Sequence, residues 1–80
     1  MIKNKWGIKV VSLKDGSLCY DSGKWSPLRD IAIPFGGKIS LLDARVEFIN
    51  KSSAIAAAKA YTDYSEYWIY KAEKRPIENL

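Results

Sequence analysis

Apolar and polar positions alternate along the first part of the chain, over residues 5–13. Every second residue from Trp6 to Val10 is large and apolar, and this period of two is typical of a strand with one buried face. An Asp-Gly pair follows within residues 14–17, and Asp-Gly supplies the positive φ angles of a tight hairpin turn. We therefore expect a β-hairpin whose second strand spans residues 17–21.

A second alternation covers residues 44–48 and leads into a helix. Its apolar side chains alternate with charged ones, which predicts another half-buried strand. The polar stretch 50–53 then offers Asn and Ser, whose side chains accept hydrogen bonds from the free N–H groups of a helix start. The helix should end near residues 62–63, where short polar side chains compete for backbone bonds. Its apolar face carries Ala54, Ala57, Ala58 and Tyr61 at helical spacing.

Residues 67–73 form the strongest predicted strand, because Tyr, Trp and Ile favour a pleated, half-buried surface. The pattern leaves two choices for its buried face. In the first, Tyr67 and Ile69 lie under the helix, and in the second Trp68 and Tyr70 do. Several aromatic side chains between residues 61 and 70 should stay partly exposed, since one small core cannot hide them all.

Residues 22–38 are expected to be an irregular loop, because prolines and glycines interrupt them. Pro34 argues against a central strand over residues 31–35, although an edge strand is compatible with the sequence. A long loop without regular structure in a small domain is often functional. The apolar residues 39–42 then lead into 44–48, and the two stretches together are compatible with one long strand.

These elements predict a single α+β domain over residues 1–80. The expected architecture is an antiparallel sheet of three to four strands packed against one helix, in the order β-β-β-α-β. Pro76 should end the last strand, and residues 74–80 should form a C-terminal tail. The chain is long enough for only a small core.

Charge and cysteine content narrow the function classes. The chain has 13 basic and 9 acidic residues, a net charge of +4, and its charges are spread along the sequence. A nucleic-acid-binding domain usually has a denser basic stripe. The single Cys19 permits no internal disulfide, which favours a cytoplasmic location. No apolar run is long enough to cross a bilayer, so we expect no membrane partner.

The chemistry-bearing residue types give no catalytic or metal motif. Histidine is absent, and histidine is the commonest general base and zinc ligand. A lone cysteine without a histidine partner does not make a papain-like nucleophile. The carboxylates fall near predicted turns at spacings typical of solvated surface charge. We expect neither a cofactor nor an enzymatic activity.

Aromatic and basic side chains are the remaining candidates for function. Trp25 lies in the predicted loop, where it is either an interface anchor or a cap on the open end of the core. Tryptophan and arginine dominate the binding energy of many interfaces. The candidate partner-binding residues are Trp25, Arg29, Tyr64, Trp68, Tyr70, Lys71 and Arg75.

The stretch FINKSSAIAAAKAYT followed by EYWIYKAE, after a hairpin and a strand, resembles the architecture of small bacteriophage-encoded inhibitors, including anti-CRISPR proteins. The resemblance covers about half of the chain and includes no diagnostic motif. It implies a non-enzymatic protein of the host cytoplasm, monomeric or homodimeric. Such a protein blocks a host protein or protein–nucleic-acid complex by occupying its surface.

The alternative is a nucleic-acid-binding accessory protein. Trp68 and Tyr70 would stack on bases, and such binding weakens steeply as salt rises. The phosphate contacts would come from Lys9, Lys24, Arg45, Lys71, Lys74 and Arg75.

Overall fold

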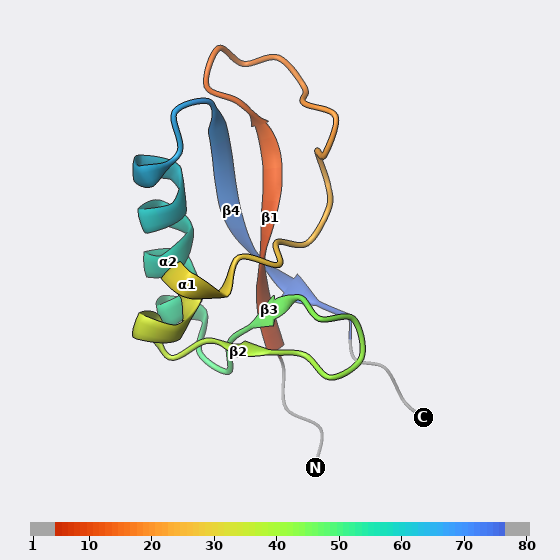
Figure 1. Ribbon diagram of the computed structural model, residues 1–80, viewed down its shortest axis with the longest axis vertical. Coiled ribbons are helices and arrows are strands. Elements are labelled where there is room, and N and C mark those ends of the chain that lie inside the picture. The colour runs from red at the N-terminus through yellow and green to blue at the C-terminus, as the bar shows by residue number, and fades with distance from the viewer. Residues whose placement is uncertain (1–4, 77–80) are drawn as a thin grey trace.

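The structure is a computed structural model that describes residues 5–76 (Figure 1). Its elements are β1 (Lys5–Leu13), α1 (Arg29–Ala32), the 3₁₀ helix η1 (Ile33–Phe35), β2 (Lys38–Ile39), β3 (Val46–Glu47), α2 (Lys51–Tyr64) and β4 (Trp68–Arg75). The expected α+β class is confirmed. The expected single sheet of three to four strands in the order β-β-β-α-β is not confirmed, because the strands form two antiparallel pairs and α1 precedes β2.

β1 is the strand on which the rest of the fold is built. Along one edge it pairs with β4, from Lys5 opposite Arg75 to Leu13 opposite Trp68. Its other edge is also bonded. Trp6 and Phe48 exchange backbone hydrogen bonds of 2.7 and 2.6 Å there, and two further bonds at that edge are Val10 N–H to Lys24 C=O (3.2 Å) and Ser26 N–H to Ile8 C=O (2.7 Å).

The hairpin predicted at the start of the chain is half right. The Asp-Gly turn forms, with Gly16 at a φ of +92° and a backbone bond of 2.8 Å from Leu13 to Ser17. The second strand expected over residues 17–21 is wrong, because this segment is loop and turn. Leu18 and Tyr20 lie exposed, and only Cys19 packs partly against the core. β1 pairs instead with the last strand of the chain.

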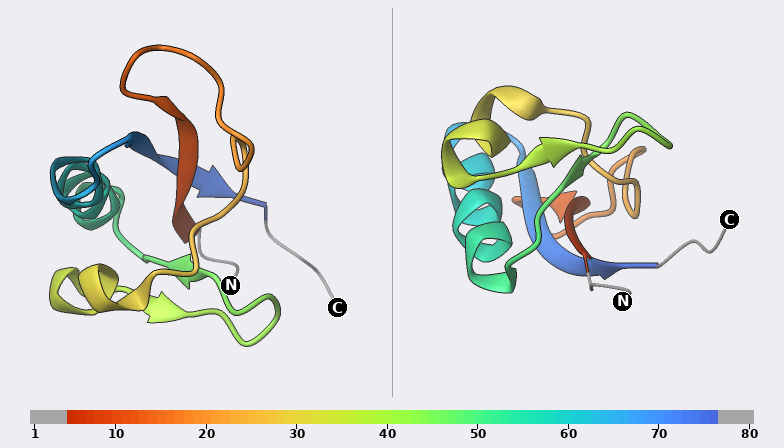
Figure 2. Two further views of the ribbon diagram at one scale, coloured as in Figure 1. Left: turned by 45° about the horizontal axis from the view of Figure 1, so that its top comes forward. Right: turned by 90° about the horizontal axis from the view of Figure 1, so that it is seen from below.

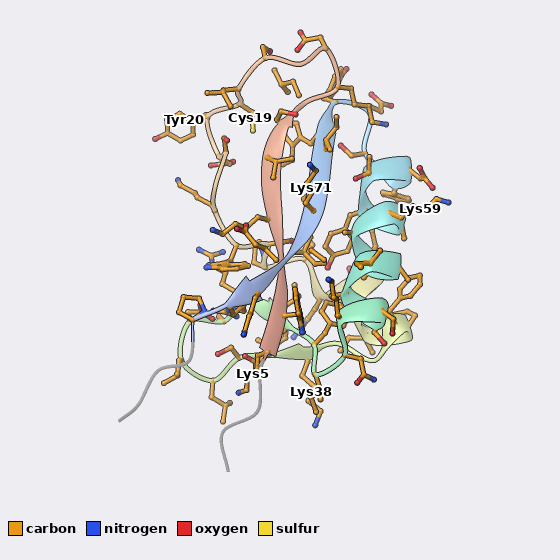
Figure 3. All side chains as sticks on the ribbon, turned by 180° about the vertical axis from the view of Figure 1, so that it is seen from behind. Lys5, Cys19, Tyr20, Lys38, Lys59 and Lys71 are labelled. Carbon is orange, nitrogen blue, oxygen red and sulfur yellow. The ribbon has the colours of Figure 1, made fainter. Side chains whose placement is uncertain are left out.

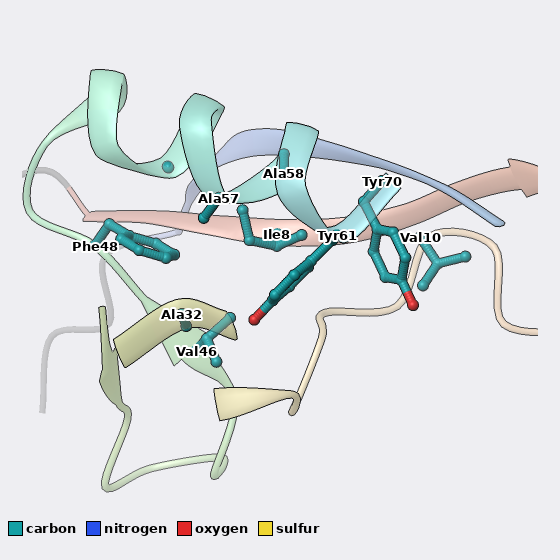
Figure 4. Packing of buried hydrophobic residues seen from close by; sticks show 10 residues of the cluster. Ile8, Val10, Ala32, Val46, Phe48, Ala57, Ala58, Tyr61 and Tyr70 are labelled. Carbon is teal, nitrogen blue, oxygen red and sulfur yellow. The ribbon is translucent and has the colours of Figure 1, made fainter. Parts of the chain in front are cut away.

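The predicted helix face is confirmed. α2 begins after Asn50 and buries Ala54, Ala57, Ala58 and Tyr61 against β1 and β4 (Figure 4). Three of these side chains are methyl groups, so the helix axis can approach the strands closely. Tyr61 meets Tyr70 edge-on, with ring centroids 5.2 Å apart.

β4 is the last strand, and the structure shows which of its faces is buried. Tyr70 is buried in the core and Trp68 is half-buried. The first choice, with Tyr67 and Ile69 under the helix, is wrong: Tyr67 is exposed and Ile69 is only half-buried. Tyr70 is the buried side chain because its ring packs against Tyr61 on α2.

Residues 22–38 are more ordered than the sequence suggests. The expectation of an irregular loop is wrong for residues 29–35, which form α1 and η1, and an edge strand over 31–35 is therefore excluded. Pro34 stands in the first turn of η1, where its missing N–H costs nothing. α1 lies beside β2 and against α2 (Figure 2), and it buries Ala32 in the core.

The stretch from residue 39 to 48 is not one long strand. β2 and β3 form a short hairpin instead, and Ser40 N–H donates to Arg45 C=O at 2.8 Å across its turn. Ala44 has a positive φ of 58° in that turn. The predicted alternation holds from Val46 onward, since Val46 and Phe48 are both buried. β4 continues to Arg75, so the expected tail starts later than residue 74, and residues 77–80 lie outside the described part of the chain.

Candidate protein-binding surface

The segment Ser26–Leu28 is hydrogen-bonded to neighbouring elements on one side and exposed to solvent on the other. Ser26 is buried and bridges two strands, donating its N–H to Ile8 at 2.7 Å and accepting from Val46 N–H at 2.9 Å. Its hydroxyl accepts from Leu28 N–H at 3.2 Å, which turns the chain outward. The Tyr61 hydroxyl donates to the Leu28 carbonyl. The Leu28 backbone is therefore fixed, while the residue remains 47% exposed.

A hollow of about 280 Å³ lies on one side of this segment. Three of the candidate partner-binding residues meet in its lining: Trp25, Trp68 and Tyr70. Asp21, Lys24 and Arg45 also line it, so the hollow is aromatic with two basic groups and one carboxylate at its wall. Lys24 is paired with Asp21 at 3.4 Å, whereas Arg45 forms no ion pair with a described residue.

A second hollow, of about 570 Å³, lies on the other side of Pro27 and Leu28, which line both. Here α1 contributes Arg29 and the last turn of α2 contributes Tyr64, whose side chain is 83% exposed. The two hollows thus form one continuous area. We call it the Leu28 surface and define it as Lys24, Trp25, Leu28, Arg29, Arg45, Tyr64 and Trp68.

Trp25 packs against β1 and does not cap the open end of the core, and its role as an interface anchor stays a prediction. Its ring lies over Gly7 of β1, where an added Cβ would come within 2.7 Å of the ring. The Lys9 ammonium lies 4.4 Å from the ring centroid and the Arg75 guanidinium lies 5.1 Å from it. Trp25 is therefore half-buried against the outer face of the β1–β4 pair, and it also contributes to the first hollow.

Three of the seven candidate residues have other positions. Tyr70 is only 6% exposed, so it supports the first hollow from below and does not present a ring for stacking. The Arg75 side chain is 11% exposed and is bound by Asp43 and, at 3.8 Å, by Glu47. Lys71 is exposed on β4 and lines neither hollow.

Ion pairing occupies three of the six basic side chains proposed for phosphate contact. Lys9 pairs with Glu73 at 3.5 Å, in addition to the pairs of Lys24 and Arg75. Burial acts to raise the pKa of Asp43, but the Arg45 backbone N–H and the Arg75 guanidinium outweigh it and lower that pKa. This arrangement weakens the nucleic-acid reading, because paired cations release fewer counterions on binding phosphate.

Sequence reasoning missed Leu28, which together with Pro27 lines both hollows. A leucine directly after proline in a polar loop was the available signal, but nothing in the sequence says that Ser26 is buried beneath it. The described residues bring no group of three His, Cys, Asp or Glu side chains together. Within residues 5–76 no helix has the length and apolar content required to span a bilayer.

Searches against protein-family models, curated proteins and solved structures find no match for this chain.

Proposed function

We propose that the chain is a small non-enzymatic binding protein of the inhibitor type, which acts by covering the surface of another protein with its Leu28 surface. The observation that carries this proposal is the pair of hollows on either side of Leu28, lined by aromatic and arginine side chains. These residue types supply most of the binding energy at protein interfaces.

Two properties of the Leu28 surface support this proposal: several of its side chains are exposed, and the backbone that carries Leu28 is held rigidly. Tyr64 and Leu28 offer large apolar area to solvent, while the bonds of Ser26 and Tyr61 fix the backbone that carries Leu28. A preorganised surface loses little conformational entropy on binding. Arg45, which forms no ion pair with a residue in the range 5–76, and the net charge of +4 favour an acidic partner surface.

The test is affinity capture from a bacterial lysate, with and without nuclease treatment. The variant Arg29→Ala/Tyr64→Ala removes two exposed side chains from the surface. The matched control Lys38→Ala/Leu41→Ala removes one basic and one apolar exposed side chain outside it. The wild type and the control should retain the same protein in both arms, and the Arg29/Tyr64 variant should lose it.

Equal capture by both variants would contradict the proposal. Capture that disappears on nuclease treatment would contradict it as well and would favour the nucleic-acid alternative.

A further inference from the structure

The hydrogen-bonding pattern of β1 determines which backbone groups of β4 point away from it. Trp6, Ile8 and Val10 direct their bonded backbone groups to the opposite side of β1, toward Phe48, Ser26 and Lys24. Directly opposite residues in an antiparallel pair are either both bonded to each other or both directed outward. The residues opposite them, Lys74, Ala72 and Tyr70, therefore direct their N–H and C=O groups to the outer edge of β4.

Only part of this outer edge is covered within the fold. The Thr62 hydroxyl of α2 accepts from Tyr70 N–H at 2.9 Å and lies 3.3 Å from the Tyr70 carbonyl. Ala72 and Lys74 have no backbone or side-chain hydrogen bond at that edge to any residue in the described range 5–76. Within the described part of the chain, two consecutive outward-facing residues of this eight-residue strand thus lack a partner.

A groove of about 300 Å³ runs between this edge and α2. Ile55, Ala58 and Ala72 give it an apolar lining, and Ile55 is 51% exposed. Lys59 on α2 and Lys71 on β4, both labelled in Figure 3, are its charged residues. The lining has no carboxylate, and neither lysine is within an ion-pair distance of a described acid.

We propose that the edge of β4 at Ala72 and Lys74 accepts an extended, acidic segment of a partner protein as an added strand. Main-chain bonds to Ala72 and Lys74 would give affinity, as in other cases of strand addition. Alternate side chains of the added segment would point to opposite faces. Apolar side chains on the α2 side would then cover Ile55, and acidic ones on the opposite face would reach Lys71, while Lys59 on α2 adds to the positive charge around the groove.

The charges around the edge disfavour a second copy of this chain as the occupant. In a symmetric antiparallel pair of β4 strands centred on residue 73, the two Glu73 side chains would lie opposite each other. In a pair centred on residue 74, the two Lys74 side chains would lie opposite each other. Like charges directly opposite are destabilising. A pair centred on Ala72 requires the Tyr70 groups that Thr62 already occupies.

The experiment is a titration of the ¹⁵N-labelled chain with a capped heptapeptide of alternating Glu and Val, next to a capped Lys-Val heptapeptide. The acidic peptide should shift the amide resonances of Ala72 and Lys74 and slow their exchange with solvent. The basic peptide should do neither. The Arg29→Ala/Tyr64→Ala variant should respond like the wild type, so failure of the Leu28 surface and failure of this edge are distinguishable.

Two substitutions at Lys74 separate charge from backbone. Lys74→Ala removes the ammonium group only, and Lys74→Pro also removes the outward N–H without breaking a bond to β1. Binding of the acidic peptide should be about five-fold weaker for Lys74→Pro than for Lys74→Ala, the effect of one net hydrogen bond. The charge-reversal variant Lys59→Glu/Lys71→Glu should abolish binding. It provides the test in place of Lys74→Pro if the proline variant does not fold.

The proposal is overturned if both peptides bind equally, if the shifts centre away from Ala72 and Lys74, or if the two Lys74 variants bind alike. Dimerisation in sedimentation experiments with protected Ala72 and Lys74 amides would overturn it too, since a second copy would then occupy the edge.

Discussion

Tyr61 connects the core of the molecule to the Leu28 surface. Its ring is buried against Tyr70, and its hydroxyl donates to the Leu28 carbonyl. Burial raises the pKa of Tyr61 to about 12. The neutral phenol is therefore the form that the fold stabilises, and ionisation of this one group opposes folding.

Replacing Tyr61 by Phe should destabilise the protein by about 1 kcal/mol at neutral pH, since one hydrogen bond is lost while the ring packing stays. For a domain of this size that lowers the melting temperature by roughly 4–8 °C. The contribution of the hydroxyl is complete below the unfolded-state pKa of roughly 10 and is lost as the pH rises toward about 12. Urea unfolding from pH 7 to alkaline pH should thus show the stability gap between wild type and Tyr61→Phe narrowing above about pH 10. If the difference in stability between the two proteins stayed constant over this pH range, ionisation of the Tyr61 phenol would not oppose folding.

At the scale of the elements, the sequence predicted what depends on local periodicity. The face of α2 that carries Ala54 and Tyr61 was predicted correctly, because helical spacing alone selects it. The strand expected over residues 17–21 failed because alternation indicates a strand and says nothing of its partner, and β1 pairs with β4 instead. α1 and η1 were missed, since each is shorter than the window over which periodicity is visible.

Thr62 joins α2 to β4 at the point where the edge of the strand would otherwise begin. Thr62→Val keeps the shape of the side chain and leaves Tyr70 N–H without its partner, which should cost about 1–3 kcal/mol. Thr62→Ser keeps the hydroxyl and should cost clearly less. Chemical denaturation of both variants is the measurement, and equal destabilisation would show that the hydroxyl bond contributes nothing.

At the scale of the whole molecule, β1 connects the two surfaces. On one side it holds Lys24–Ser26, which leads to Leu28. On the other it holds β4, whose far edge at Ala72 and Lys74 has no partner among residues 5–76. The sequence named Trp25, Arg29, Tyr64 and Trp68 of the Leu28 surface from residue type alone. It could not place them together, because that depends on contacts between segments far apart in the chain. The position of Leu28 between the two hollows depends on such contacts, and so does the edge at Ala72, which has no partner among residues 5–76.

Residue-resolved amide hydrogen exchange of the free chain tests this arrangement most directly. If β1 is bonded on both edges and β4 on one, the amides of Trp6 and Val10 should be protected, and so should those of Gly7 and Lys9, which face β4. Alternation should appear along β4, where Lys71 and Glu73 exchange slowly while Ala72 and Lys74 exchange fast. Fast exchange at Trp6 and Val10, or equal protection of all four β4 amides, would contradict the account.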